Sequence, residues 1–152
     1  MPISEVEERP DRHHVKNLNS KTLHYEELQA SKLKQASEVL DLLDFRSVYK
    51  LLGVPTPQTS AEILHWMERE KMIQSIDDTG YYILNFGVLS CAYNLNQFDG
   101  LSCKNVRVIK YKGVTKKETE KEQPGKKGYA IGYEGLINYI YRIIKEEVNS
   151  FS

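Results

Sequence analysis

Apolar residues recur at helical spacing in three successive segments of the first half of the chain. Residues 37–44 place four apolar positions on one broad side, and Ser37 is a favoured N-cap residue. Residues 45–53 follow with a second apolar face. Gly53 is a natural helix end, because Pro55 prevents the helix from continuing. The pattern predicts two short helices joined by a tight connection.

The third segment gives the clearest helical signal. Thr59 and Glu62 have the spacing of a capping box, in which two side chains satisfy the first free N–H groups of a helix. Ile63, Leu64 and Met67 then form an apolar stripe at i, i+1, i+4 spacing. A third helix is therefore predicted to begin at Thr59.

The residues around this helix favour other elements. Residues 73–84 are typical of a β-hairpin, because the turn-forming run DTG at 78–80 is followed by the strand-forming run YYIL. Residues 86–95 predict a small apolar helix with Cys91 on its packed face. Residues 23–33 favour a short helix only weakly. The order of three helices and a hairpin is that of a winged helix.

The last third of the chain changes character. Residues 106–113, VRVIKYKG, read as a strand whose two faces are apolar at the centre and basic toward the ends, so we expect a core strand buried on both faces. Residues 115–128 have no apolar period, and we expect a long, mobile, net-positive loop. Residues 134–148 form a helix with a broad apolar side that another surface should cover.

These elements predict an α+β fold with winged-helix-like helices and a β-hairpin, followed by a basic strand, a loop and a C-terminal helix. Residues 1–22 are polar and are expected to be a flexible N-terminal arm. Residues 23–103 are expected to form the winged-helix-like domain. Residues 104–152 are expected to pack on that domain or on a further domain.

Charge is distributed unevenly along the chain, although the formal net charge is zero. Residues 1–103 contain ten lysine and arginine residues against fifteen acidic ones. Residues 104–127 contain nine basic residues against three glutamates. An anionic partner would therefore be steered to the second of these segments.

The predicted third helix is poorly suited to reading a DNA groove, although that is a common role of the helix before a wing. Its polar side carries three glutamates against Arg69 and Lys71, and the wing adds Asp77 and Asp78. These acids would be repelled by phosphates. The winged-helix-like part is therefore expected to be a scaffold or a protein-contact module.

Basic residues with nearby tyrosines make the segment from the strand onward the better candidate for nucleic acid. Lysine and arginine neutralise phosphates, and bases of a single strand stack on aromatic rings. The alternative is an ordinary solvated, charged loop. The predicted phosphate contacts are Lys104, Arg107, Lys110, Lys112, Lys116, Lys117, Lys126 and Lys127, and the predicted stacking residues are Tyr111 and Tyr129.

The chain contains no motif for catalysis, cofactor binding or metal binding. Cys91 and Cys103 have neither metal-ligand nor disulfide-framework spacing, and His13 and His14 lack further ligands. His65 lies on a polar helix face. We therefore expect no enzyme activity and no cofactor. No apolar run approaches the roughly 20 residues that span a bilayer, and no signal peptide is visible, so a cytoplasmic protein without membrane contact is expected.

A resemblance to a known family covers residues 37–145. It rests on the runs EVLDLLDFRSVYKLLGVPTP, AEILHWMEREKMI, YYILNFGVLSCAYNLNQFDGLSCKNVRVIKYKG and GYAIGYEGLINYI. The chain resembles the middle segment of the prokaryotic Schlafen/AlbA-like DNA-binding, divergent-ATPase family. Its members are labelled transcriptional regulators or RecG-like ATP-dependent DNA helicase-related proteins. No complete DNA-binding domain of this type and no full ATPase region is found here.

The resemblance implies a nucleic-acid-linked context without catalysis in this segment. Together with the basic residues, it predicts a nucleic-acid-associated, DNA-binding module of a transcriptional regulator or helicase-related protein, with DNA as the expected partner. The alternative is a protein-interaction or connector module. Such a module would self-associate, or dock a neighbouring ATPase domain, through the helix at 134–148.

Overall fold

The computed structural model describes residues 22–114 and 116–151. The predicted N-terminal arm, apart from Thr22, lies outside the described residues, as do His13 and His14. The elements in chain order are η2 (Tyr25–Glu27), α2 (Ala36–Leu42), α3 (Phe45–Leu52), α4 (Ser60–Arg69), β1 (Ile73–Ile76), β2 (Gly80–Ile83), α5 (Asn85–Cys91), η3 (Leu95–Gln97), η4 (Ser102–Lys104), β3 (Arg107–Tyr111), β4 (Thr119–Pro124) and α6 (Tyr129–Ser150).

The three predicted helices of the first half are present as α2, α3 and α4. The N-cap of α2 is Gln35 and not the expected Ser37, and the Glu38 carboxylate accepts a hydrogen bond from the Gln35 N–H at 2.8 Å. The α3 helix ends at Gly53, whose φ of 69° is a left-handed conformation that glycine adopts without strain. At α4, the Thr59 hydroxyl accepts from the backbone N–H of Glu62.

The predicted hairpin is present as β1 and β2, which pair antiparallel from Ile73↔Ile83 to Ile76↔Gly80. The segment before α2 lies along the other edge of β2, where Lys34 and Tyr81 exchange two backbone hydrogen bonds. The weak helix expected over residues 23–33 is therefore wrong beyond the single turn of η2. Its backbone groups bond to β2 instead of to one another.

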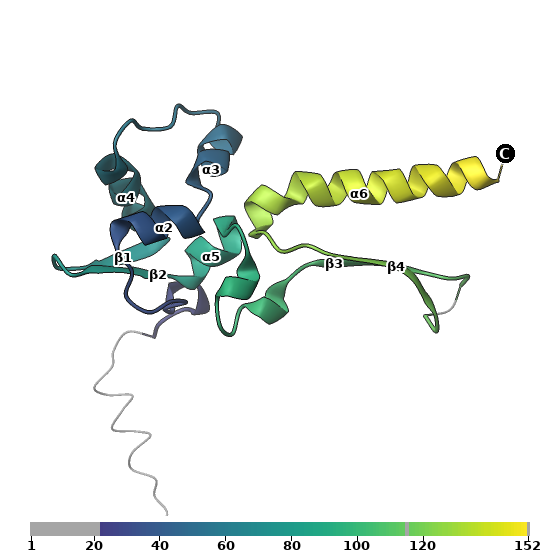
Figure 1. The fold of residues 1–152 in the computed structure, drawn as a ribbon, viewed down its shortest axis with the longest axis horizontal. Coiled ribbons are helices and arrows are strands. Elements are labelled where there is room, and N and C mark those ends of the chain that lie inside the picture. Colours follow the sequence, from purple (N-terminus) through teal and green to yellow (C-terminus); the bar gives the residue numbers. More distant parts are fainter. Residues whose placement is uncertain (1–21, 115, 152) are drawn as a thin grey trace, which may run out of the picture.

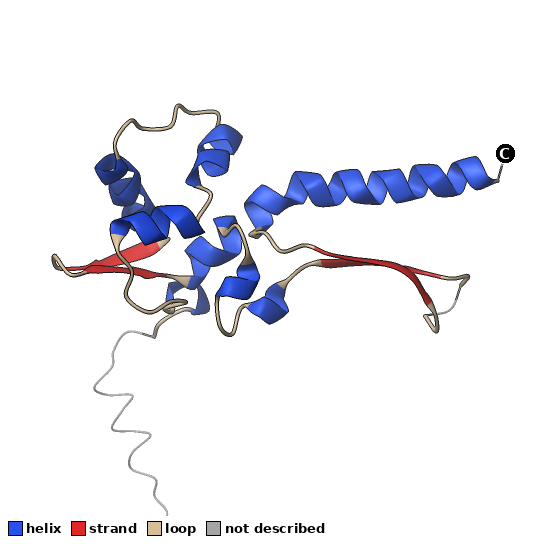
Figure 2. Ribbon diagram, viewed as in Figure 1, coloured by secondary structure: helices blue, strands red, loops and turns tan. Residues whose placement is uncertain are grey.

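We call residues 25–104, from η2 to η4, the head. Its buried hydrophobic cluster includes Val39, Leu43, Met67, Ile83 and Leu95, and α2 and α4 pack against the hairpin strands. Cys91 belongs to this cluster and is fully buried, as the sequence predicted. Helices and small antiparallel sheets together make the chain an α+β protein (Figure 2). The winged-helix assignment stays a prediction.

We call β3, β4 and α6 the extension, because they run side by side away from the head (Figure 1). β3 and β4 pair antiparallel from Arg107↔Pro124 to Tyr111↔Thr119. The predicted loop over 115–128 is therefore partly wrong, because residues 119–124 form β4. Every residue of β4 is exposed, so this strand is held by main-chain pairing with β3 rather than by burial.

The expected core strand is also corrected. β3 forms within the predicted range, but none of its residues is buried, and Arg107 is exposed. The strand leaves the head and pairs with β4 alone, so its two faces lack the covering layers that a core strand has.

Gly128 joins the extension to the head. Its N–H donates to the Ala92 carbonyl at 2.9 Å, and a Cβ at this position would lie 2.5 Å from the Cys91 backbone nitrogen. Only glycine permits so close an approach of two backbones. Beyond this point Ile131 packs against the head cluster, and the rest of α6 extends outward.

Candidate nucleic-acid interface

Three of the predicted phosphate-binding residues on β3 and just after it are paired with glutamates from β4 and its approach. The Arg107 guanidinium lies 3.2 Å from Glu122, and the Lys112 ammonium lies 3.6 Å from Glu118. The Lys110 ammonium lies 3.1 Å from Glu120. The basic strand is thus largely neutralised by its own partner strand, which weakens its attraction for phosphate.

Lys110 also ties the hairpin to α6. It lies directly opposite Lys121 in the sheet register, an arrangement of like charges that is unfavourable by itself. The Lys110 ammonium lies 2.7 Å from Glu147, and the Lys121 ammonium lies 3.0 Å from Glu146. Hydrogen bonds to Glu147 and then to Glu120 raise the pKa of Lys110. The hydrogen bond from Lys121 lowers the pKa of Glu146.

Four further residues that the sequence predicts to bind nucleic acid are spread over separate parts of the structure. The Lys104 ammonium lies 5.6 Å from the centroid of the Tyr25 ring, a cation–π contact with the head. Tyr111 is half-buried in the hairpin, opposite Thr119. Lys116 and Lys117 are exposed between β3 and β4, at the far end of the hairpin from the head.

A cavity of about 610 Å³ lies at the base of the extension, between the first half of α6, the start of the hairpin and the residues that follow α5. Lys126, Lys127 and Tyr129 line it, so three of the ten predicted residues come together here. Arg142 supplies a third cation from α6. The other tyrosines among the lining residues are Tyr93, Tyr133 and Tyr139.

The charged residues that line this cavity are all basic. No aspartate or glutamate is among the described residues that line it. Lys126, Lys127 and Arg142 form no ion pair with any described residue, in contrast to the lysines of β3. Arg142 does act on the charge of Glu146, one turn further along α6, so Lys126 and Lys127 are the cations most available to an anionic ligand.

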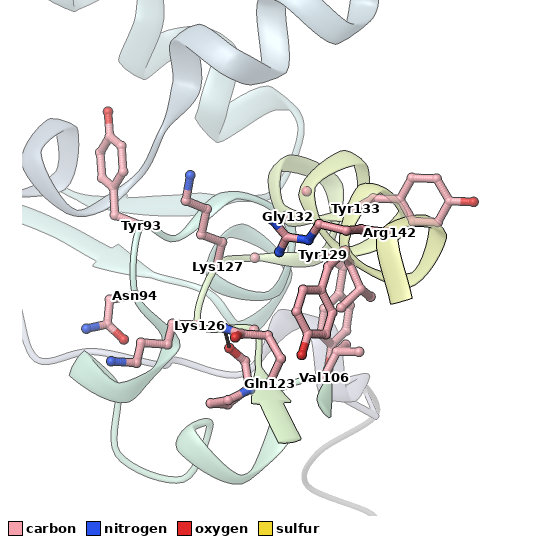
Figure 3. Close-up of a pocket in the computed structure, with 16 residues that line it drawn as sticks. Tyr93, Asn94, Val106, Gln123, Lys126, Lys127, Tyr129, Gly132, Tyr133 and Arg142 are labelled. Carbon is pink, nitrogen blue, oxygen red and sulfur yellow. Dashed lines mark hydrogen bonds between the residues drawn. The ribbon is translucent and has the colours of Figure 1, made fainter. Parts of the chain in front are cut away.

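The side chains in the cavity are partly held in place. The Tyr129 hydroxyl donates to the Lys104 carbonyl at 2.7 Å, and the Arg142 guanidinium carbon lies 5.4 Å from the centroid of the Tyr139 ring. Figure 3 shows Tyr129 and Arg142 in the middle of the group, with Lys126 and Lys127 to one side and the Tyr133 ring pointing outward. The Tyr129 ring and the three cations therefore lie around the same cavity.

The segment that carries the two lysines is itself attached to the head. The N–H of Leu95 donates to the Lys126 carbonyl at 2.7 Å, and Gly128 bonds to Ala92 as described above. These bonds hold residues 126–128 on the chain that follows α5. Lys126 and Lys127 therefore lie on an anchored segment, and not within the free loop that the sequence predicted.

Sequence reasoning missed Tyr93, Tyr133, Tyr139 and Arg142. Arg142 comes from α6, and Tyr93 is the second residue after the end of α5, so the two are far apart in the sequence. Only the approach of α6 to α5 brings them to one cavity.

The described part of the chain contains no group of three or more histidine, cysteine, aspartate or glutamate residues that could hold a metal ion. Within the same residues, no helix combines the length and apolar character that crossing a membrane requires. Comparison with protein-family models, with curated proteins and with solved structures gave no match for this chain.

Proposed function

We propose that this chain is a nucleic-acid-associated module, non-catalytic by itself, whose binding surface is the base of the extension. The observation that carries the proposal is the set of three cations, Lys126, Lys127 and Arg142, at a tyrosine-lined cavity without an acidic lining residue. Cations neutralise phosphates and tyrosine rings stack on bases. The resemblance to the Schlafen/AlbA-like family makes DNA the expected nucleic acid.

The head is proposed to be a scaffold. The basic residue at the end of α4 and the one just after it are both close to glutamates, since Arg69 lies 3.6 Å from Glu70 and Lys71 lies 3.0 Å from Glu27. Asp77 and Asp78 add negative charge to the β1–β2 turn. A phosphate backbone would meet a weaker field at this surface than at the base of the extension.

Fluorescence anisotropy with labelled single- and double-stranded DNA and RNA, at low and physiological salt, tests the proposal. The Lys126→Glu, Lys127→Glu double variant should weaken binding strongly. The slope of log affinity against log salt concentration should fall by about one per lysine, because each lysine that contacts a phosphate releases a counterion.

The matched control is the Lys116→Glu, Lys117→Glu double variant, which makes the same charge change at the far end of the hairpin. We expect it to retain most of the affinity. Equal binding by the Lys126/Lys127 variant and the unmodified chain would contradict the proposal, as would no binding of any nucleic acid at low salt.

The exposed side of α6 favours a second candidate function, that of a protein-interaction module that self-associates. Ile137, Tyr141, Ile144, Val148 and Phe151 are exposed and alternate at spacings of four and three residues. This is the spacing at which one helix packs along another in a coiled coil. The same stripe on a second copy is self-complementary, as a two-fold interface requires.

Sedimentation equilibrium over a wide range of protein concentration tests this second candidate. A mass that rises with concentration, and that returns to the monomer value in an Ile144→Glu variant, would support it. A monomer at every concentration would exclude self-association through α6. Neither result affects the cavity, because Ile144 does not line it.

A further inference from the structure

We propose that the cavity at the base of the extension receives one unpaired nucleotide, with its base against the tyrosine rings and its phosphate near Lys126 and Lys127. This inference rests on the proposed function and names what enters the site. It differs from a charged surface that merely follows a phosphate backbone, because it requires a hollow of suitable size beside the cations.

The size of the cavity fits a ligand of this class. Sites that hold small organic ligands have volumes of roughly 300–1,000 Å³, and the cavity measures about 610 Å³. A base within a duplex is stacked on both faces and has no free face to offer a protein ring. The nucleotide that enters is therefore an unpaired one.

The lining supplies a partner for the base and a partner for the phosphate of a nucleotide. The Tyr129 ring lies in the middle of the group and offers a stacking surface that accepts any base (Figure 3). Lys126 and Lys127 lie to one side of it, where a phosphate attached to the stacked base can reach them. Arg142 also lines the cavity, next to the Tyr139 ring, and no acidic side chain of the lining opposes the phosphate charge.

Two glycines of α6 keep one wall of the cavity bare. Gly132 and Gly135 both line it, and a Cβ at Gly135 would meet no atom within 4 Å. The packing therefore leaves room for a side chain at position 135, although glycine is among the least favourable residues inside a helix. Without a side chain at these two positions, a flat base can approach the helix backbone closely.

The test fills this space. A Gly135→Leu variant places a side chain in the cavity without changing charge, and leucine favours the helix more than glycine does. We expect its affinity for a labelled single-stranded oligothymidylate to fall by about tenfold, the effect of losing one stacked base. Circular dichroism should show unchanged or slightly increased helicity. An Asn138→Leu variant is the control, since Asn138 is exposed on α6 and does not line the cavity.

The outcome separates this inference from the proposed function. If the Lys126/Lys127 double variant loses affinity while Gly135→Leu binds the single strand normally, the cavity inference is overturned and the charged surface stands. If the lysine variant binds normally, the proposed function itself fails. Tighter binding of a duplex than of a single strand of the same sequence would also overturn the cavity inference.

The source of the nucleotide is identified by competition. Thymidine monophosphate at millimolar concentration that displaces the labelled strand, and that shifts the amide NMR signals of Gly132 and Gly135, would identify a free nucleotide as a sufficient ligand. Displacement by an unlabelled oligothymidylate alone, with the same amide shifts, would identify a strand. Amide signals that stay unshifted under both ligands would overturn the inference.

Discussion

In the head, hydrophobic side chains from Val39 to Leu101 form one buried cluster, whereas the strands and the long helix of the extension bury no residue. Burial of apolar surface contributes about 25 cal/mol per Å² and dominates folding. Exposed ion pairs contribute little, typically about 0–1 kcal/mol each. The head is therefore expected to supply nearly all of the stability of the chain.

The extension has a different organisation. It is fastened to the head at Gly128, and its hairpin meets α6 through Lys110 and Lys121. Its unpaired cations and its exposed apolar stripe remain open to other molecules. The comparison teaches that the part of the chain with the least core offers the most surface for partners, and the following predictions test this division.

The largest difference in the free energy of unfolding is expected between alanine variants of two isoleucines. Ile83 is fully buried in the head, and Ile144 is 55% exposed on α6. Ile83→Ala should lower the free energy of unfolding by about 2–5 kcal/mol, because it leaves a cavity in the core. Ile144→Ala should change it by about 0.5 kcal/mol or less. Urea denaturation of both variants at low protein concentration measures the two values, and comparable losses would show that the extension shares the core.

A smaller effect is expected at the junction. Gly128→Ala forces a Cβ against the backbone of Cys91 and Ser90, so we expect a loss of about 1–3 kcal/mol or detachment of the extension. Limited proteolysis near residue 128 and small-angle scattering would detect the detachment. The control is Gly135→Ala, where the added Cβ meets nothing and the helix should gain stability. Equal behaviour of the two variants would refute a close junction.

The smallest effect concerns pH. The pKa of Glu146 is lowered by Lys121, so its contribution is present above the unfolded-state value of about 4.3 and is lost as the pH falls through the lower folded-state value. The pKa of Lys110 is raised, so its contribution is present below about 10.4 and is lost as the pH rises through the higher folded-state value. The contact between α6 and the hairpin should thus loosen at both extremes.

Amide exchange corrected for intrinsic rates, measured at pH 3 and pH 7, checks the acid limb. Protection in the second half of α6 should fall more than protection in α5. At neutral pH, Lys110→Gln should loosen α6 more than Lys121→Gln. The side chain of Lys110 is 18% exposed and touches two carboxylates, whereas that of Lys121 is 44% exposed and touches one. The reverse order would contradict the assigned roles.

The head was largely predictable because local signals and burial agree there. The apolar stripe behind Thr59, the glycine at position 53 and the turn at 78–80 each correspond to an element boundary that the structure contains. The exception is the segment 29–34, whose backbone bonds to β2. This pairing depends on a strand about 50 residues later in the chain, so the local sequence pattern does not predict it.

The extension was less predictable because its second strand has no apolar signal. The run TEKEQP at 119–124 is exposed throughout and reads as a loop. It becomes a strand because β3 offers it main-chain partners and because Arg107 and Lys110 attract Glu122 and Glu120. The same ion pairs neutralise much of the positive charge that made β3 a candidate for phosphate contacts.

The sequence by itself determined the α+β class, the helices and hairpin of the head, and the excess of positive charge in residues 104–127. These follow from composition, periodicity and capping, which are properties of neighbouring residues. Only the tertiary structure decided which cations are paired and which line a cavity. Charge neutralisation depends on distances between atoms from different elements, and Arg142, Tyr93 and the two lysines line one cavity only because α6 begins against α5.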